Sequence, residues 1–362
     1  MPGEAFRYLK WGNDTVGIVH ADLSVQFTEP NYNTVMHLYT QGRLSWTSEE
    51  FLQFLSERIP SASRRDIEKI LFRCGLSQYD VFKVADVTHA INPRDELWLA
   101  SSAGDRLSDA TTEVFEEVFH QRVDMIGESV DTPEGANVKR YAACNGAYGI
   151  VKQRFSPLAT DVESEIAVYL LAQRMGVACC PAVRFDADSV FSEFCYDFTR
   201  ESIVHMRRLF DGPRGENELQ NLLGVRPQYA EDFYRMLALD FVTRQDDRHL
   251  SNMAVKVTPE GESFYPLYDN GRSLFFEDTE EFVQQASRNP EQYVTTFGYA
   301  GTYWDHVQDI VASGVKLGEL VSLEIEDDEI AGILVQAGFK GYRLEGAQVW
   351  IAHCLAALRG IG

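Results

Sequence analysis

The sequence lacks long apolar runs and any recognisable leader segment. No stretch approaches the roughly 18–20 apolar residues that a membrane-spanning helix requires. The N-terminal residues Met1-Pro2-Gly3-Glu4 have neither the basic region nor the apolar core of a signal peptide. These absences argue against a membrane protein and against secretion, so we expect a cytoplasmic protein with reduced thiols.

The sequence also lacks metal-binding cysteine spacings and has little positive charge. Its cysteines include no C-x-x-C pair and no Cys/His zinc spacing, and adjacent Cys179-Cys180 is typical of a buried β segment. The formal net charge of −22 argues against direct binding of a nucleic-acid backbone or an anionic membrane. A hydrophobic content of 45% over 362 residues is enough for two ordinary domains.

One polar segment between two apolar stretches contains several candidate functional residues. Asp247 and Asn252 stand in the pattern D-x-x-x-x-N, a spacing that suits a catalytic base and a metal-binding amide. Further along, Tyr268-Asp269-Asn270-Gly271 supplies a second carboxylate, followed two residues later by glycine. Transfer of a phosphoryl group to a hydroxyl needs an oxyanion to accept the proton and hard oxygen ligands for Mg²⁺. We therefore expect Asp247 to act as the base, and Asn252 and Asp269 as the metal ligands.

A simpler interpretation of the same residues stays open. The pattern D-x-x-x-x-N occurs by chance in many chains, and Asp247-Arg248-His249 could form a surface turn with a local ion pair. The order of Lys152, Asp247, Asn252 and Asp269 along the chain favours the functional interpretation, because phosphoryl transfer by a kinase needs these residue types in this order.

These motifs resemble those of a known family. Asp247-Arg248-His249-Leu250-Ser251-Asn252 and Leu267-Tyr268-Asp269 are similar to the catalytic and metal motifs of HipA-like kinases, including the CtkA-type enzymes. The resemblance extends from about Asp124 to the C-terminus, and Gln245 departs from it where many members have asparagine. It implies an α+β, two-lobed protein-kinase-like fold, with a small antiparallel β lobe and a large helical lobe. It also implies ATP and Mg²⁺ or Mn²⁺ as cofactors.

The small lobe is expected to contain a loop and a lysine that contact the ATP phosphates. β-prone runs cover residues 123–129, 138–142 and 148–153, and the turn between the first two contains Gly135 as its single glycine. This turn lies where kinases place a phosphate-covering loop, although an ordinary hairpin is the alternative. Lys152 ends the third run in a context similar to the kinase V-A-I-K strand. Burying the charged end of a lysine in an apolar strand costs free energy unless the ammonium group has a partner. The alternative is a lysine at the edge of the strand with its ammonium group in water.

The partner of this lysine and the site of the adenine base are expected further along the chain. A helix is predicted to begin near Thr160, and Glu165 in its first turns is the predicted partner of the lysine. Glu163 is the alternative, because it shares a face with apolar residues of the same helix. Backbone groups from Glu193 to Cys195 are expected to form a hinge that meets the adenine edge.

We expect three segments along the chain. Residues 1–105 form an N-terminal α+β accessory module, residues 106–195 the small lobe and residues 196–362 the large helical lobe. The accessory module contains no predicted catalytic residue, so it acts either in docking or substrate recognition, or as a structural cap on the small lobe.

Local patterns predict the elements of these segments. Residues 15–19 and 33–39 are predicted strands, and Thr47 with Glu50 predicts a helix that starts with a capping box. Ser63 is predicted to cap a second helix. In the last segment, a helical stripe from Tyr229 to Phe241 and further helices over residues 293–311 and 348–358 are predicted.

The sequence therefore predicts an ATP- and Mg²⁺-dependent phosphotransferase, and the resemblance implies a serine/threonine protein kinase with a protein or peptide substrate. One alternative is a lipid or small-molecule kinase of the same fold. Another is a kinase-shaped binding protein without catalysis. An antitoxin-like or regulatory partner is a further hypothesis, whereas nucleic acid and membrane are not expected as direct partners.

Overall fold

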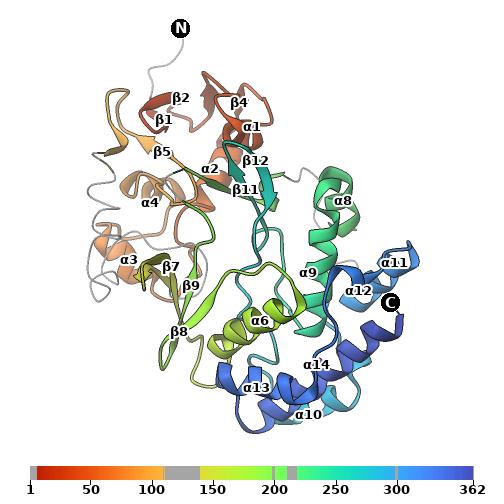
Figure 1. Cartoon of the computed structure of the whole chain (residues 1–362). Helices are drawn as coiled ribbons and strands as arrows, with labels where there is room; N and C mark the ends of the chain where they lie inside the picture. Colours follow the sequence, from red (N-terminus) through yellow and green to blue (C-terminus); the bar gives the residue numbers. More distant parts are fainter. Residues whose placement is uncertain are drawn as a thin grey trace. The chain divides into compact units, whose positions relative to one another are not determined.

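The computed structural model describes residues 6–108, 110, 139–197, 200–209, 218–297 and 301–361, and its chain falls into two compact units (Figure 1). Unit 1 consists of Met1–Gln153, Tyr196–Val204 and Lys256–Gly261. Unit 2 consists of Arg154–Cys195, His205–Val255 and Glu262–Gly362. This grouping differs from the three predicted segments, because it places the N-terminal region together with the strand that carries Lys152. The functional division into three segments stays a prediction.

Two predicted features fall outside the described residues, namely the loop with Gly135 and the strand over residues 123–129. No helix among the described residues combines the length and the apolar composition that a membrane crossing requires.

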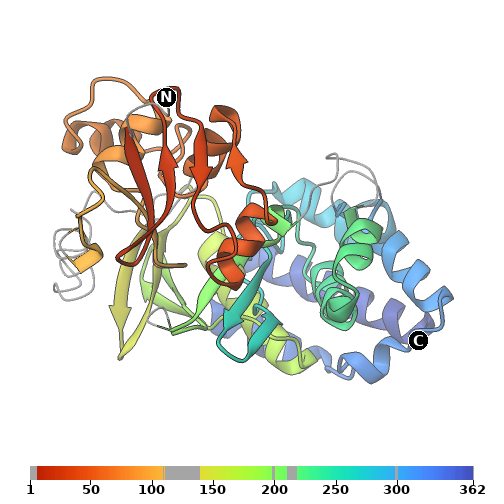
Figure 2. The same ribbon diagram turned by 90° about the horizontal axis from the view of Figure 1, so that it is seen from above.

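The N-terminal part of unit 1 is a five-stranded antiparallel sheet in the order β4-β3-β2-β1-β5 (Figure 2). Its strands are β1 (Arg7–Trp11), β2 (Asp14–Val19), β3 (Val25–Phe27), β4 (Ser45–Trp46) and β5 (Leu97–Ala100). The predicted strand over residues 15–19 is confirmed as β2. Val16, Val19 and Trp98 are almost fully buried, so the sheet contributes one face to the core of unit 1.

Four short helices belong to the same unit. They are α1 (Thr34–Thr40), α2 (Ser48–Ser56), α3 (Ile67–Arg73) and α4 (Val81–Val87). The capping box of Thr47 and Glu50 at the start of α2 is confirmed. The strand predicted over residues 33–39 is wrong, because the Asn33 side chain accepts a hydrogen bond from the Met36 backbone and starts helix α1. The Ser63 cap is also wrong, since α3 begins at Ile67 after Asp66.

A hairpin near the end of unit 1 carries the predicted phosphate-binding lysine. Strands β6 (Lys139–Cys144) and β7 (Ala147–Gln153) pair antiparallel and correspond to two predicted strands. Asn145 and Gly146 connect them, and both have positive φ, of 52° and 85°. This matches the type I′ turn that Asn-Gly favours in two-residue hairpins. Lys152 lies in β7 and is 9% exposed.

Unit 2 is mainly helical and contains one antiparallel hairpin, formed by β8 (Ala182–Asp186) and β9 (Ser189–Glu193). Its first helices are α6 (Asp161–Met175), α7 (Met206–Leu209), α8 (Glu218–Val225) and α9 (Ala230–Val242). Its later helices are α10 (Glu280–Arg288), α11 (Tyr303–Ala312), α12 (Leu317–Leu320), α13 (Asp327–Ala337) and α14 (Gly341–Ile361). Two 3₁₀ turns cover Pro227–Tyr229 and Pro290–Gln292. Strands β10 (Ser202–His205), β11 (Ala254–Thr258) and β12 (Gly261–Phe264) lie where the chain passes from one unit to the other.

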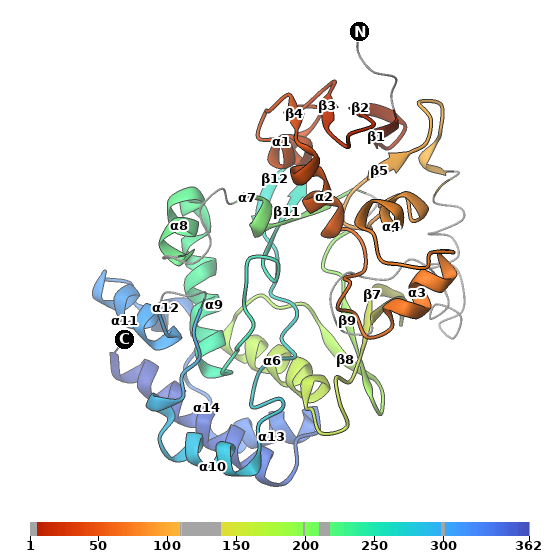
Figure 3. The same ribbon diagram turned by 180° about the vertical axis from the view of Figure 1, so that it is seen from behind.

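The long C-terminal helix α14 packs on α9, α10 and α13, and α13 in turn packs on α6 (Figure 3). The predicted helical stripe is confirmed as α9, and the helix over residues 348–358 is confirmed as part of α14. The helix predicted over residues 293–311 is wrong in its first half. Helix α11 starts only at Tyr303, because Thr302 and Asp305 form a capping box there.

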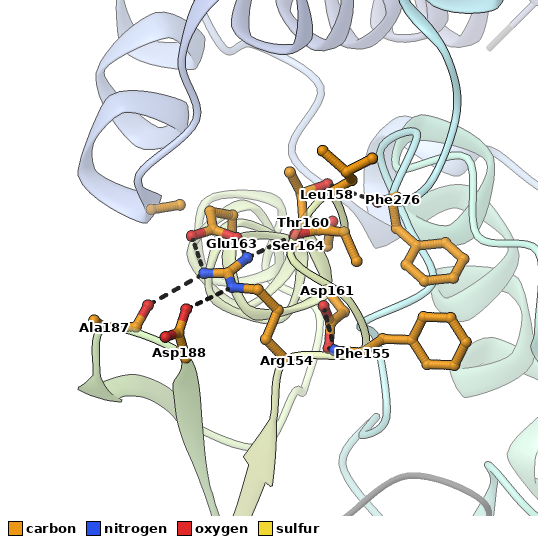
Figure 4. A network of polar contacts seen from close by, with 12 residues as sticks. Arg154, Phe155, Leu158, Thr160, Asp161, Glu163, Ser164, Ala187, Asp188 and Phe276 are labelled. Atoms are coloured by element: carbon orange, nitrogen blue, oxygen red, sulfur yellow. Dashed lines mark hydrogen bonds and ion pairs between the residues drawn. The ribbon is translucent and has the colours of Figure 1, made fainter. Parts of the chain in front are cut away.

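Helix α6 is anchored at its N-terminal end by a network of polar contacts within unit 2 (Figure 4). Arg154 donates two hydrogen bonds to the Glu163 carboxylate, at 2.6 and 2.8 Å. Arg184 donates a third, at 3.1 Å, and also bonds to the Ala337 carbonyl at the end of α13. Burial alone would raise the pKa of Glu163, but the bonds from Arg154 outweigh it and the pKa is lowered. Glu163 therefore stays charged and attaches the helix to its surroundings.

Further contacts join the same end of α6 to a loop that follows Asp269. The Ser164 hydroxyl donates to the Ser273 carbonyl at 2.7 Å, and the Thr160 backbone N–H donates to the Phe276 carbonyl at 2.8 Å. Both carboxylate oxygens of Asp161 accept from the Phe155 backbone N–H, at 3.1 and 3.0 Å. Helix α6 is thus attached to this loop over its first turn.

Asp161 generates a test of this anchor. Burial raises the pKa of Asp161 from 3.8 to about 6, and the Phe155 N–H offsets only part of the rise. Between about pH 4 and 6 the folded chain holds a proton that the unfolded chain releases, so the free energy of unfolding falls as the pH rises across this range. In Asp161→Asn this loss is absent. We expect the variant to gain up to about 2–3 kcal/mol relative to the wild type as the pH rises from about 4 to 6, and nothing more above it.

Urea unfolding of both proteins across this pH range measures the difference. The free energies of unfolding of the two proteins can also differ by an amount that does not depend on pH, because asparagine has only one oxygen to accept the Phe155 N–H. Wild-type and variant curves that run parallel from about pH 4 to 7 would show that Asp161 does not retain its proton in the folded protein.

Candidate active site

The segment with Asp247 leaves helix α9 through a fixed turn. Arg244 has a φ of 50°, and the Gln245 backbone N–H donates to the Asp240 carbonyl at 3.0 Å. The Arg244 N–H donates to the Phe241 carbonyl at 3.3 Å. These two bonds form a Schellman motif, which ends a helix with a left-handed residue. The direction in which the loop from Thr243 to Met253 departs is therefore fixed by the helix end.

A buried ion pair connects this loop to the helix behind it. Arg248 donates two hydrogen bonds to the Asp240 carboxylate, both at 2.9 Å, and both side chains are 0% exposed. Burial opposes the charge on Arg248, but Asp240 outweighs it and raises the pKa of the guanidinium. The Tyr303 hydroxyl adds a long hydrogen bond to Asp240, at 3.4 Å.

The same guanidinium also binds the segment that contains Asp269. Arg248 donates to the Asn270 side-chain oxygen at 2.6 Å and to the Tyr268 carbonyl at 2.9 Å. Asp269 lies between these two residues and has a φ of 57°, in the left-handed region. One arginine thus holds the two candidate site loops in a defined relation.

Asp247 is held through its backbone. Its N–H donates to Gln245 Oε1 at 2.8 Å, and its carbonyl accepts from Asn252 Nδ2 at 2.8 Å. Its carboxylate has no hydrogen bond or ion pair within the described part of the chain. Burial raises the pKa of Asp247, and the charges of Asp269 and Asp246 raise it further, against the opposing effect of His249 and Arg272. A partly buried carboxylate with a raised pKa beside a second carboxylate is typical of catalytic sites.

The contacts of Asn252 leave one atom suited to a cation. Its Nδ2 faces the Asp247 carbonyl, so its Oδ1 points elsewhere. No group of three or more His, Cys, Asp or Glu side chains among the described residues could hold a metal by itself. An amide oxygen and a carboxylate are hard ligands that fit Mg²⁺ when phosphate oxygens and water complete its shell. Asn252 and Asp269 fit that description.

The predicted partner of the lysine lies beside the same loop. A Cβ atom added to Gly271 would lie 3.4 Å from Glu165 Oε2 and 3.3 Å from the Asp161 carbonyl oxygen. Glu165 is 2% exposed. A glycine two residues after Asp269 therefore allows helix α6 to approach closely, and Glu165 reaches the loop that carries the candidate metal ligand.

The structure brings four of the predicted site residues together in unit 2, namely Asp247, Asn252, Asp269 and Glu165. Lys152 belongs to unit 1, so its pairing with Glu165 stays a prediction. Glu163, the alternative partner, is occupied by Arg154 and Arg184.

The predicted hinge differs from the simplest expectation. The Glu193 N–H donates to the Pro181 carbonyl at 2.9 Å, and the Cys195 N–H donates to the Tyr265 hydroxyl at 2.9 Å. Both backbone donors are therefore used within the protein in this conformation. The adenine-binding role of Glu193 and Cys195 stays a prediction, and it would have to use other backbone groups or displace Tyr265.

Three residues of this arrangement were not predicted from the sequence, namely Asp240, Arg154 and Tyr265. Asp240 had a usable signal, because an acid within the apolar run Leu239-Asp240-Phe241-Val242 needs a buried partner and Arg248 is close in sequence. Arg154 directly follows a strand and has no local pattern that predicts its partner. Tyr265 is joined to Cys195 only by the fold.

The chain was compared with protein families, curated proteins and solved structures, and only solved structures match it. No protein-family model matches the chain, and no curated protein matches it in sequence. The crystal structure of the proinflammatory kinase CtkA of Helicobacter pylori matches with a TM-score of 0.49 and 15% identity, over 64% of this chain and 90% of that chain. HipA of Shewanella oneidensis MR-1, solved in complex with HipB and operator DNA, matches with a TM-score of 0.53 and 14% identity.

The HipA match covers 98% of this chain and 99% of that chain, so it includes the N-terminal region as well as the candidate site. At this identity the likeness is one of fold. The predicted α+β fold of the HipA-like kinases is thereby confirmed: this chain has the fold of HipA over almost its entire length.

Proposed function

We propose that this protein is an ATP- and Mg²⁺-dependent phosphotransferase, and specifically a serine/threonine protein kinase. The observation that carries the proposal is the grouping in unit 2 of an uncommitted carboxylate, Asp247, with the cation ligands Asn252 and Asp269. The arrangement supplies the positioning and charge neutralisation on which phosphoryl transfer depends. The protein substrate rests on the likeness to the HipA-like kinases.

Each residue has a defined part in this reaction. The Asp247 carboxylate takes the proton of the acceptor hydroxyl as the hydroxyl oxygen bonds to the γ-phosphorus. The bond from that phosphorus to the β–γ bridging oxygen breaks, and ADP leaves. Asn252 Oδ1 and the Asp269 carboxylate would hold Mg²⁺, which would neutralise charge on the phosphates. The raised pKa of Asp247 suits a base, because it brings proton affinity closer to neutral pH.

A partner protein is proposed from the likeness to a solved complex. The Shewanella HipA structure contains HipB and operator DNA, which supports an antitoxin-like partner for this chain. With a formal net charge of −22, this chain would contact such DNA through its partner. A lipid or small-molecule acceptor is the competing proposal, since Asp247 would deprotonate any correctly placed hydroxyl.

Incubation with labelled ATP and Mg²⁺ tests the activity. With cell lysate as a source of acceptors, the wild type should label protein bands, and Asp247→Ala should label none. Labelling of the lipid or small-molecule fraction alone would favour the competing acceptor class. Equal labelling by wild type and Asp247→Ala would exclude Asp247 as the base.

The metal assignment predicts unequal effects of two variants. Asp269→Asn should weaken Mg²⁺-dependent ATP binding by about 10-fold or more, because it removes a charged ligand. Asp247→Asn should change ATP binding little, since Asp247 acts on the acceptor. Calorimetry with Mg²⁺ and with EDTA measures both. Equal ATP affinity with and without Mg²⁺ in the wild type would contradict the role of Asn252 and Asp269.

Lys152 and the two glutamates of α6 can be separated in one series. Lys152→Ala and Glu165→Gln should abolish transfer and leave the melting temperature nearly unchanged. Glu163→Gln should instead lower the melting temperature, because it weakens the bonds from Arg154 and Arg184. Activity measured at low temperature, where all variants are folded, provides the comparison. An active Lys152→Ala variant would identify this residue as an ordinary strand lysine.

A further inference from the structure

Gln245 is a fully buried polar residue beside the candidate base. Its exposed fraction is 0%, and its backbone is bonded on both sides. The N–H donates to the Asp240 carbonyl at 3.0 Å, and the carbonyl accepts from the Thr295 hydroxyl at 2.6 Å. The backbone of Gln245 is therefore fixed from the end of helix α9 and from the segment before α11.

The side chain of Gln245 is fixed by Asp247. Its Oε1 accepts the Asp247 backbone N–H at 2.8 Å. Only the oxygen of the amide can accept from an N–H, so this bond sets the orientation of the whole amide group. Together with the bond from Asn252 Nδ2 to the Asp247 carbonyl, both peptide groups of Asp247 are bound by buried amide side chains. We call this arrangement the amide clamp of Gln245 and Asn252.

The clamp leaves one atom of Gln245 without a partner. Its Nε2 is buried and has no hydrogen-bond partner among the described residues. A buried donor of this kind costs about 1–3 kcal/mol, and an apolar side chain of similar volume would avoid the cost. Such exceptions gather at functional sites, where local stability is exchanged for positioning. The cost therefore argues against a purely space-filling role.

We propose that Gln245 is a positioning residue, which holds Asp247 through its backbone N–H so that the carboxylate faces the acceptor hydroxyl. The inference rests on the proposed phosphotransfer function and deepens it. A shift of about 1 Å in a reacting group can cost about 100-fold in rate. The carboxylate of Asp247 has no hydrogen bond or ion pair within the described residues, so the backbone clamp is what sets the direction of its Cα–Cβ bond.

Two variants remove the clamp and one keeps it. Gln245→Met preserves the volume but has no amide oxygen to accept the Asp247 N–H, and Gln245→Leu has no acceptor either. Gln245→Glu keeps the acceptor and adds a negative charge near Asp247. Gln284→Met, on the exposed face of helix α10, is the matched control.

Hydrogen exchange and kinetics are then measured on the full-length protein. In Gln245→Met and Gln245→Leu, exchange of the Asp247 amide should accelerate by about 10-fold or more, because its hydrogen bond is lost. The kcat should fall by about 10–100-fold with an unchanged KM for ATP. The control should match the wild type in both measurements.

Gln245→Glu supplies a rescue by a conservative variant, because its carboxylate oxygen can accept the Asp247 N–H as the amide oxygen does. Its Asp247 amide should therefore stay as protected as in the wild type, unlike in the two clamp-free variants. Rapid exchange of this amide in Gln245→Glu would overturn the inference.

The outcomes separate this inference from the proposed function. If the wild type transfers no phosphoryl group, the proposed function fails, and the exchange rates still decide whether Gln245 holds Asp247. If exchange is unchanged in both clamp-free variants, Gln245 does not hold Asp247 and the inference is overturned. It is also overturned if exchange accelerates while kcat per folded molecule stays at the wild-type level.

Discussion

The buried pair of Arg248 and Asp240 is the interaction on which the candidate site depends. It joins the end of helix α9 to the loop of Asp247, and Arg248 extends to the Tyr268 carbonyl and to Asn270. Removing one member of a fully buried pair costs about 3–5 kcal/mol, because the other charge stays without compensation. Lysine could not replace the arginine, since a single ammonium group cannot bind a carboxylate in two places and reach two further acceptors in one plane. The loop of Asp247 and the segment of Asp269 are thus joined through one planar group.

Helix α6 carries two buried glutamates, Glu163 and Glu165, with different surroundings. Glu163 binds Arg154 and Arg184 and attaches the helix to α13. Glu165 lies against Gly271, beside the loop of Asp269. Because the first turn of α6 is also bonded to Ser273 and Phe276, the helix and this loop form one connected part of unit 2. Any displacement of α6 would therefore break contacts on both glutamates together.

The sequence was most informative where the signal is local. Capping at Thr47, the stripe of α9 and the order of Asp247, Asn252 and Asp269 need only residue types and spacing, and the α+β fold followed from the motifs they resemble. The failures have physical causes. Residues 33–39 are rich in β-formers, but the Asn33 cap and burial on one face favour helix α1. The partners of Glu163, Arg154 and Arg184, lie outside helix α6, so helical periodicity could not exclude Glu163 as the partner of the lysine. The bond from the Cys195 N–H to Tyr265 likewise depends on tertiary structure alone.

The strained backbone positions of unit 2 lie in the loops of the candidate site. Among the described residues of this unit, the non-glycine residues with positive φ are Arg244, Asp269, Leu274 and Phe275. Each such conformation costs about 1–2 kcal/mol for an ordinary side chain, and all of them lie in the two loops that carry Asp247 and Asp269. Strain persists only where surrounding contacts determine the conformation. In these two loops, the surrounding contacts come from the buried Arg248, from the Schellman motif at Arg244 and from the bonds to helix α6. Because the loops are held against their own preference, the backbone at Asp247 and Asp269 is fixed by the fold itself, which is the preorganisation that the proposed phosphoryl transfer would require.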